Sequence, residues 1–128
     1  MKAAKTTLAM MIAAIVTSAS VMAAPPTYTK DVLPILQENC QTCHRPSGAN
    51  LSGMIAPMSF MNYKEVRPWS KAIARAVANG QMPPWHATKE FHGVFKNERT
   101  ITDEQRQVLI DWAKTGAKRG NPSDAPEP

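Results

Sequence analysis

Apolar residues recur at helical spacing in three parts of the chain. The first part spans residues 28–44, and its apolar positions are Val32, Leu33, Ile35 and Leu36. This spacing predicts a short helix that runs into residues 40–44. We expect Asp31 to cap this helix, with Pro34 inside its first turn. If Thr29 is the cap instead, Pro34 bends the helix.

The second helical pattern lies within residues 62–80. One apolar stripe repeats there every three or four residues: Val66, Trp69, Ile73 and Val77. Asn62 is placed to cap the helix, and Gly80 is placed to end it. Pro68 is expected to divide the stretch into a short helix and a longer one. On this stripe, Trp69 is expected to lie in the core.

A third pattern predicts a helix between Thr102 and Gly116. Thr102 is followed three residues later by Gln105, which is the spacing of a capping box, and Gly116 is suited to end the helix. The apolar face of this helix consists of Val108, Leu109, Trp112 and Ala113. Trp112 is therefore expected in the core.

Two long segments between these helices, 45–60 and 81–100, contain prolines and glycines and have no apolar period. No stretch alternates apolar and polar residues, so no strand is predicted. The sequence thus predicts an all-α fold of about three to four helices. Long structureless loops are uncommon in a small domain. They are acceptable here if something other than polypeptide fills the space between the helices.

The N-terminal residues have the pattern of a secretory signal. "MKAAK" is positively charged, Leu8–Val16 is apolar, and small residues suited to a signal peptidase follow. The apolar run is too short to span a membrane. We therefore expect a signal peptide at 1–24, a domain at 25–120 without a membrane span, and a disordered polar tail at 121–128. The mature protein is expected in the periplasm or another extracytoplasmic compartment.

The charge of the chain is modest. Its 128 residues have a formal net charge of +5. Lys2 and Lys5 lie in the expected signal peptide, so the mature chain has about +3. This charge is too small and too scattered to indicate nucleic-acid binding.

Both cysteines of the chain lie in one short motif, "CQTCH", at Cys40, Cys43 and His44. Two cysteines with a two-residue spacer and a following histidine are typical of covalent attachment of a c-type haem. The two thiols add to the two vinyl groups of the porphyrin, and the histidine becomes the proximal iron ligand. The motif, together with the signal peptide, predicts one covalently attached haem c (heme c).

Two other chemistries use the same residue types. A thioredoxin-like oxidoreductase requires a strand before the motif and a βαβ context, and the sequence has neither pattern. A zinc module could combine the cysteines with His86 and His92. Reduced zinc-binding thiolates are not expected in an oxidising compartment, so both alternatives are less favoured.

Met82, in "GQMPPW" between the second and third helical patterns, is the expected sixth ligand of the iron. A thioether suits haem iron, and two prolines after Met82 stiffen its loop. His86 and then His92 are the alternatives. A backbone carbonyl in the loop after the motif, with Pro57 as the candidate, is expected to orient the proximal His44.

Other side chains are expected around the same site. Met54 and Met58 are too close to the motif in the chain to be suitable distal ligands. They are expected to line the pocket. Trp85, beside the methionine loop, is placed to form a wall of the haem site or to donate a hydrogen bond from its indole.

These residues resemble a class I (monohaem) cytochrome c domain over 28–120. The sequence pattern "IAPMSF…VRPWSKAI…MPPWHA" is similar to that of a bacterial branch of these domains, which has an MPPW-type distal loop. The resemblance implies a small cytochrome c-like fold around one haem, carried by Cys40 and Cys43 with His44 and Met82 as axial ligands. It also implies that the first and last helices cross, which would bring two leucines of the first to the apolar face of the last: Leu33 and Leu36 to Leu109 and Trp112.

The haem motif and the resemblance together predict an electron carrier rather than an enzyme. The protein would pass one electron between extracytoplasmic redox proteins and transform no substrate itself. The alternative is a haem-based ligand binder or sensor, in which Met82 is weakly held or replaced by a histidine.

Overall fold

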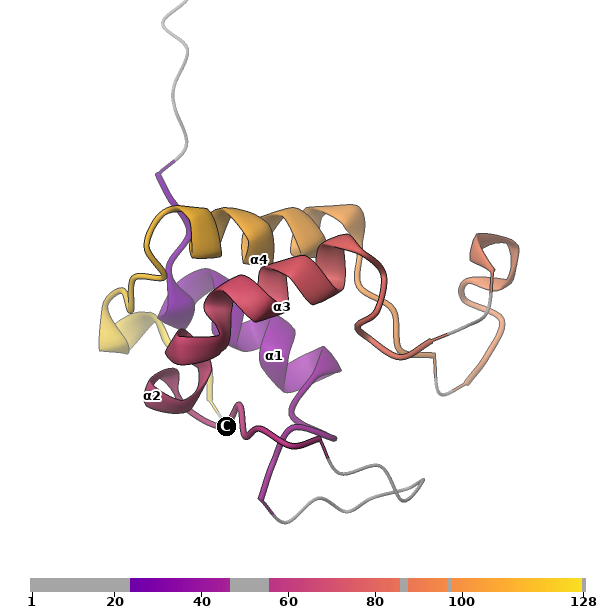
Figure 1. Cartoon of the computed structure of the whole chain (residues 1–128), viewed down its shortest axis with the longest axis horizontal. Helices are drawn as coiled ribbons and strands as arrows, with labels where there is room; N and C mark the ends of the chain where they lie inside the picture. The colour runs from indigo at the N-terminus through magenta and orange to yellow at the C-terminus, as the bar shows by residue number, and fades with distance from the viewer. Residues whose placement is uncertain (1–23, 47–55, 86–87, 97, 128) are drawn as a thin grey trace, which may run out of the picture.

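The computed structural model describes residues 24–46, 56–85, 88–96 and 98–127. Within these ranges the protein is helical and has no strand, which confirms the all-α class (Figure 1). The described α-helices are α1 (Leu33–Asn39), α2 (Tyr63–Val66), α3 (Ser70–Ala78) and α4 (Asp103–Lys114). None of the helices in the described ranges is long and apolar enough to cross a membrane. The short turns are η1 (Tyr28–Val32), η2 (Arg67–Trp69), η3 (Lys89–Phe91) and η4 (Pro122–Asp124).

The first helix begins earlier than the sequence pattern indicates. It starts at Tyr28 as the π-helical turn η1 and continues as α1, with Pro34 near the start of the α-helical part. Asp31 is therefore inside the first turn, and the prediction that it is the cap is wrong. Its carboxylate instead accepts hydrogen bonds from the N–H (2.7 Å) and the Oγ1 (3.2 Å) of Thr27, the residue before the helix. Thr29 also lies within the turn.

The middle segment divides as expected. The Asn62 side chain accepts a hydrogen bond from the Glu65 N–H (3.2 Å) at the start of α2, and Pro68 lies in the turn η2 that separates α2 from α3. Gly80 follows α3 with φ of +68°, a conformation that favours glycine. These caps and breaks confirm the predicted pair of helices.

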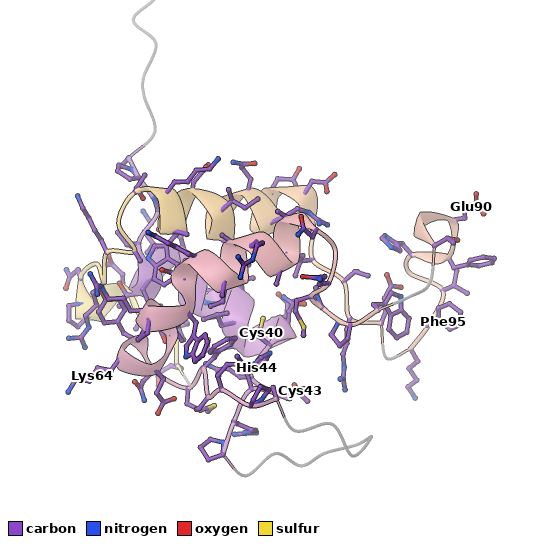
Figure 2. The ribbon with its side chains drawn as sticks, in the orientation of Figure 1. Cys40, Cys43, His44, Lys64, Glu90 and Phe95 are labelled. Atoms are coloured by element: carbon purple, nitrogen blue, oxygen red, sulfur yellow. The ribbon has the colours of Figure 1, made fainter. Side chains whose placement is uncertain are left out.

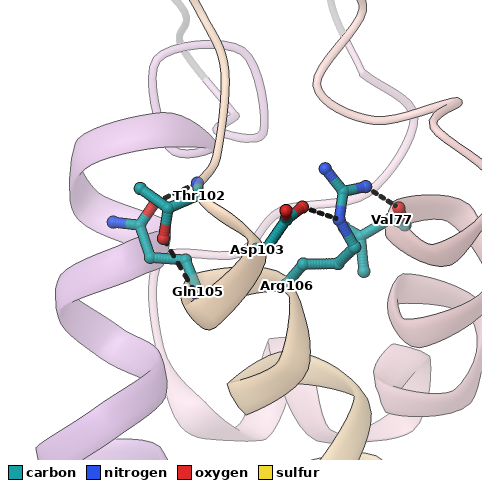
Figure 3. A network of polar contacts seen from close by, with 5 residues as sticks. All are labelled: Val77, Thr102, Asp103, Gln105 and Arg106. Atoms are coloured by element: carbon teal, nitrogen blue, oxygen red, sulfur yellow. Dashed lines mark hydrogen bonds and ion pairs between the residues drawn. The ribbon is translucent and has the colours of Figure 1, made fainter.

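The fourth helix has the predicted capping box (Figure 3). The Gln105 N–H donates to Thr102 Oγ1 (3.1 Å), and the Thr102 N–H donates to Gln105 Oε1 (3.0 Å). One turn along, Arg106 donates from Nη1 to the carbonyl of Val77 (2.9 Å) at the end of α3, and its Nε lies 3.6 Å from Asp103. Arg106 thereby fastens the start of α4 to the end of α3.

The hydrophobic core lies where η1 and α1 meet α3 and α4. α3 and α4 lie side by side, with α1 behind them in this view (Figure 1). Gln105 Nε2 of α4 donates to Glu38 Oε2 of α1 (3.4 Å). The largest fully buried side chains are Trp112, Leu36, Leu109, Val32 and Val66. Leu33 packs against this cluster, so the four residues expected to meet between the first and last helices share one core.

The two ends of the domain are joined by backbone hydrogen bonds. The N–H groups of Tyr28 and Thr29 donate to the carbonyls of Lys118 and Arg119, both at 2.9 Å. The buried Trp112 donates from Nε1 to the same Lys118 carbonyl (2.9 Å). Residues that follow the last helix thus supply hydrogen-bond acceptors for the first turn of the first helix.

The residues after this junction differ from the disordered tail expected from the sequence. Asn121 accepts a hydrogen bond from the Ser123 N–H (3.2 Å) and thereby caps the turn η4, which contacts η1. Gln37 of α1 also donates to the carbonyl of Glu127 (3.3 Å). A short polar segment can be ordered by such side-chain caps even without an apolar core of its own.

Tyr28→Phe is expected to stabilise the protein by about 1 kcal/mol at neutral pH. Tyr28 is 3% exposed, and its hydroxyl has no hydrogen-bond partner among the described residues. Tyr63→Phe is the matched control and should destabilise by a similar amount, because the Tyr63 hydroxyl donates to the carbonyl of Ala117 (2.9 Å). Guanidinium unfolding measures both changes, and equal effects of the two variants would contradict the difference in pairing.

The same tyrosine should make the protein sensitive to alkali. Burial, with the nearby Glu65 charge, raises the pKa of Tyr28 to about 12. The unfolded tyrosine ionises near pH 10. The unfolding free energy should therefore fall as pH rises from about 10 through about 12. When unfolding curves are measured across this pH range, the Tyr28→Phe variant should not show this decrease in unfolding free energy.

Candidate functional site

The cysteine motif forms a single turn at the end of α1. Cys40 is the C-cap of α1, and its carbonyl accepts hydrogen bonds from the N–H groups of Cys43 (3.1 Å) and His44 (2.9 Å). Residues three apart on such a turn lie on the same face. Figure 2 shows the side chains of Cys40, Cys43 and His44 gathered at this end of α1. The turn therefore presents two thiols and one imidazole together.

The loop at 56–60 holds this turn in place. The Ala56 N–H donates to the Cys43 carbonyl (3.3 Å), and the Phe60 N–H donates to the His44 carbonyl (2.9 Å). Gln41 returns a hydrogen bond from Nε2 to the Phe60 carbonyl (2.9 Å). The motif is thus fastened at several points to the loop that follows it, and its side chains are oriented by the fold.

His44 is held in one tautomer. Its ring is 9% exposed, and Nδ1 lies 3.1 Å from the carbonyl of Met58. A carbonyl can only accept, so Nδ1 carries the proton and Nε2 has a free lone pair. The predicted partner, Pro57, is wrong by one residue. The predicted kind of partner, a backbone carbonyl in this loop, is correct.

The surroundings of His44 favour the neutral ring. Burial lowers the pKa of His44, and the hydrogen bond to Met58 opposes this effect only in part. The ring stacks on Phe60, with centroids 4.1 Å apart and planes at 9°. A neutral, fixed imidazole with a free Nε2 is the form that binds a metal.

Cys40 is a poor candidate for the attacking thiol of thiol–disulfide exchange. Both cysteines are partly buried, and they are not joined in a disulfide. Burial, with a further contribution from Cys43, raises the pKa of Cys40 to about 12. Cys40 also lies at the C-terminal end of a helix, where the helix dipole disfavours a thiolate. Reactive cysteines instead have a lowered pKa, as at helix N-termini.

All four predicted site residues line one cavity of about 400 Å³. Cys40, Cys43 and His44 reach it from the motif turn, and Met82 reaches it from the loop after α3. Its volume lies within the range of cofactor and ligand sites. Its walls are mainly apolar and include Leu36, Ala56, Pro57, Met58, Phe60, Trp69, Ala72, Ile73, Ala76, Pro83 and Pro84.

The loop that holds Met82 is anchored to the end of α3. The N–H groups of Gln81 (2.9 Å) and Met82 (3.2 Å) both donate to the carbonyl of Ala76. Met82 is 40% exposed, so its side chain lies at the rim of the cavity. Of the histidine alternatives, His92 is exposed and does not line the cavity. His86 lies outside the described residues.

Trp69 is not in the core, contrary to the expectation from its helical stripe. It is 42% exposed because the turn η2 interrupts the helix around it, and its indole forms part of the cavity wall. Met58 lines the cavity as predicted, and Met54 lies outside the described residues. Trp85 packs edge-on against Phe95, with ring centroids 5.6 Å apart.

No family model matches the chain, and neither curated proteins nor solved structures give a match. In the described ranges, no group of three or more His, Cys, Asp and Glu side chains is placed to hold a metal ion.

Arg99 is a cavity residue that the sequence pattern does not reveal. Its Nη1 donates a hydrogen bond to Cys43 Sγ (3.3 Å), although the two residues are 56 positions apart. It lies just before the cap of α4, in a segment without apolar period. No local spacing signals such a contact, because it depends on how the long loop returns to the body of the protein.

Proposed function

We propose that this protein is an extracytoplasmic monohaem c-type cytochrome that carries one electron between redox proteins. Cys40 and Cys43 attach the haem, and His44 and Met82 are its axial ligands. The observation that carries the proposal is that all four side chains line the same apolar cavity of about 400 Å³.

The residues present fit a covalently attached haem. Cys40 and Cys43 offer two thiols from one turn, and each would hold the haem through a thioether, its sulfur and proton adding across one vinyl group. His44 offers Nε2 because the Met58 carbonyl holds its other nitrogen. Met82 offers a soft sulfur from the rim of the same cavity.

When bound, haem iron supplies a one-electron redox couple. The protein's part is to fix the ligands and to exclude water. The apolar walls lower the local dielectric constant, and the hydrogen bonds between the motif and the loop 56–60 limit movement of His44. We propose that the protein carries electrons and is not an enzyme.

The expected partners are extracytoplasmic redox proteins, one as electron donor and one as acceptor. This placement rests on the signal-peptide pattern of residues 1–24. Export also brings the chain into the compartment where a c-type haem is attached. Nucleic-acid binding is not part of the proposal.

The test is a pyridine haemochrome spectrum together with intact mass spectrometry of the exported protein. The expected result is one covalent haem per chain and cleavage after residue 23 or 24. A purified exported protein with native helicity and no covalent haem would show the proposal to be wrong.

A second candidate function is a haem-based ligand binder or sensor. The 40% exposure of Met82 favours it, because an exposed ligand at the cavity rim is easier to displace. Carbon monoxide distinguishes the two. The carrier should keep a methionine–iron charge-transfer band when oxidised, and its reduced form should not bind the gas readily. Rapid binding by the native reduced protein would support the sensor.

A further inference from the structure

One charged side chain stands in the wall of the otherwise mainly apolar cavity. Among the described residues that line it, Arg99 is the only one with a permanent charge. Its guanidinium lies against Cys43, which places the charge beside the motif turn rather than in open solvent. Arg99 is half-buried.

No carboxylate among the described residues forms an ion pair with Arg99. The ion pair found in those ranges joins Arg106 to Asp103, on α4. The nearest acidic residue in sequence, Glu98, is engaged elsewhere: Oε1 accepts from Thr100 Oγ1 (3.0 Å), and Oε2 accepts from the Gly93 N–H. An arginine that faces a mainly apolar cavity without a carboxylate therefore acts at full charge on whatever the cavity holds.

We propose that Arg99 sets the reduction potential of the site by placing a fixed positive charge at the cavity wall. This inference rests on the proposed haem function. Reduction transfers one electron from the donor protein to the iron, which changes from ferric to ferrous, and the charge of the centre falls by one. A nearby cation repels the oxidised centre more than the reduced one, so Arg99 raises the potential.

The size of the effect follows from Coulomb's law. At an effective dielectric constant of about 20, two unit charges roughly 12 Å apart interact strongly enough to change an equilibrium constant about tenfold. For a one-electron couple, a tenfold change corresponds to about 59 mV. The charge, not the shape of the side chain, is the property that matters.

The test is spectroelectrochemical titration of the purified holoprotein and its variants. Arg99→Gln and Arg99→Met should both raise the ratio of oxidised to reduced protein about tenfold at a given electrode potential, a fall of about 59 mV. Arg99→Lys keeps the charge and should stay within about twofold of wild type. Arg75→Gln is the matched control, because Arg75 is exposed on α3 and does not line the cavity. It should also stay within twofold.

Covalent haem content is measured first in every variant, and it separates the two proposals. Wild-type protein without covalent haem overturns the proposed function. Wild-type protein with haem and neutral variants with an unchanged potential overturn the role of Arg99 alone. If both neutral variants lose the haem and Arg99→Lys keeps it, the charge is needed for attachment, and the role in setting the potential is wrong as stated. An equal fall of potential in Arg99→Lys would also overturn it.

Discussion

Exchange of both Cys40 and Cys43 for serine is expected to abolish covalent haem completely and to reduce the helical content of the exported chain. If the proposed function is correct, a haem without thioethers would be held only by weak contacts and by its axial ligands. Loss of the haem would leave the apolar walls of the cavity of about 400 Å³ facing water. Acid–acetone extraction followed by a haemochrome assay measures the attachment, and far-UV circular dichroism measures the helicity.

His92→Ala is the control for the cysteine variant. His92 is exposed and does not line the cavity, so this variant should keep one haem per chain and its full helicity. The same control also tests a zinc module, in which loss of His92 would weaken the fold. A double serine variant with the circular dichroism and thermal transition of the wild type would contradict a core organised around a cofactor.

Trp112→Ala is expected to lower the free energy of unfolding by about 3–5 kcal/mol. The Trp112 ring is fully buried, it lies 6.2 Å from the ring of Tyr28, and it donates to the Lys118 carbonyl. Its removal leaves a cavity between the first and last helices and takes away one of the two hydrogen bonds that the Lys118 carbonyl accepts. Because small domains have about 5–15 kcal/mol of stability in total, much of this holoprotein should be unfolded near 50 °C.

Guanidinium unfolding of the holoprotein at constant pH measures this loss. Phe91→Ala is the control, because Phe91 is 49% exposed and its truncation should cost less than about 0.5 kcal/mol. A loss below about 1 kcal/mol for Trp112→Ala would show that this ring does not hold the two ends of the domain together.

Local signals in the sequence were enough to predict most helix ends. Asn62, Thr102 and Gly80 act through hydrogen bonds or backbone conformations within a few residues of themselves, so their roles can be recognised from spacing. Trp69 shows the limit of this approach. Its position on a helical stripe indicates burial, but the turn around Pro68 rotates it towards the cavity.

The candidate site was predictable where its residues are close in sequence or where their side-chain chemistry points to them. The motif turn follows from the spacing of Cys40, Cys43 and His44, and the carbonyl partner of His44 was located to within one residue. Met82 was chosen for its chemistry, and the fold brings it to the same cavity. Arg99 could not be predicted, since its contact with Cys43 depends on the path of the loop between α3 and α4.

The junction between the two ends of the domain has a consequence for the order of events during synthesis. A chain that emerges from its N-terminus presents Tyr28 and the cysteine motif long before Lys118 has been made or delivered. The residues whose carbonyls pair with the first turn of the first helix are therefore synthesised last. During this interval Cys40 and Cys43 lie on a chain whose first helix still lacks its hydrogen bonds to Lys118 and Arg119.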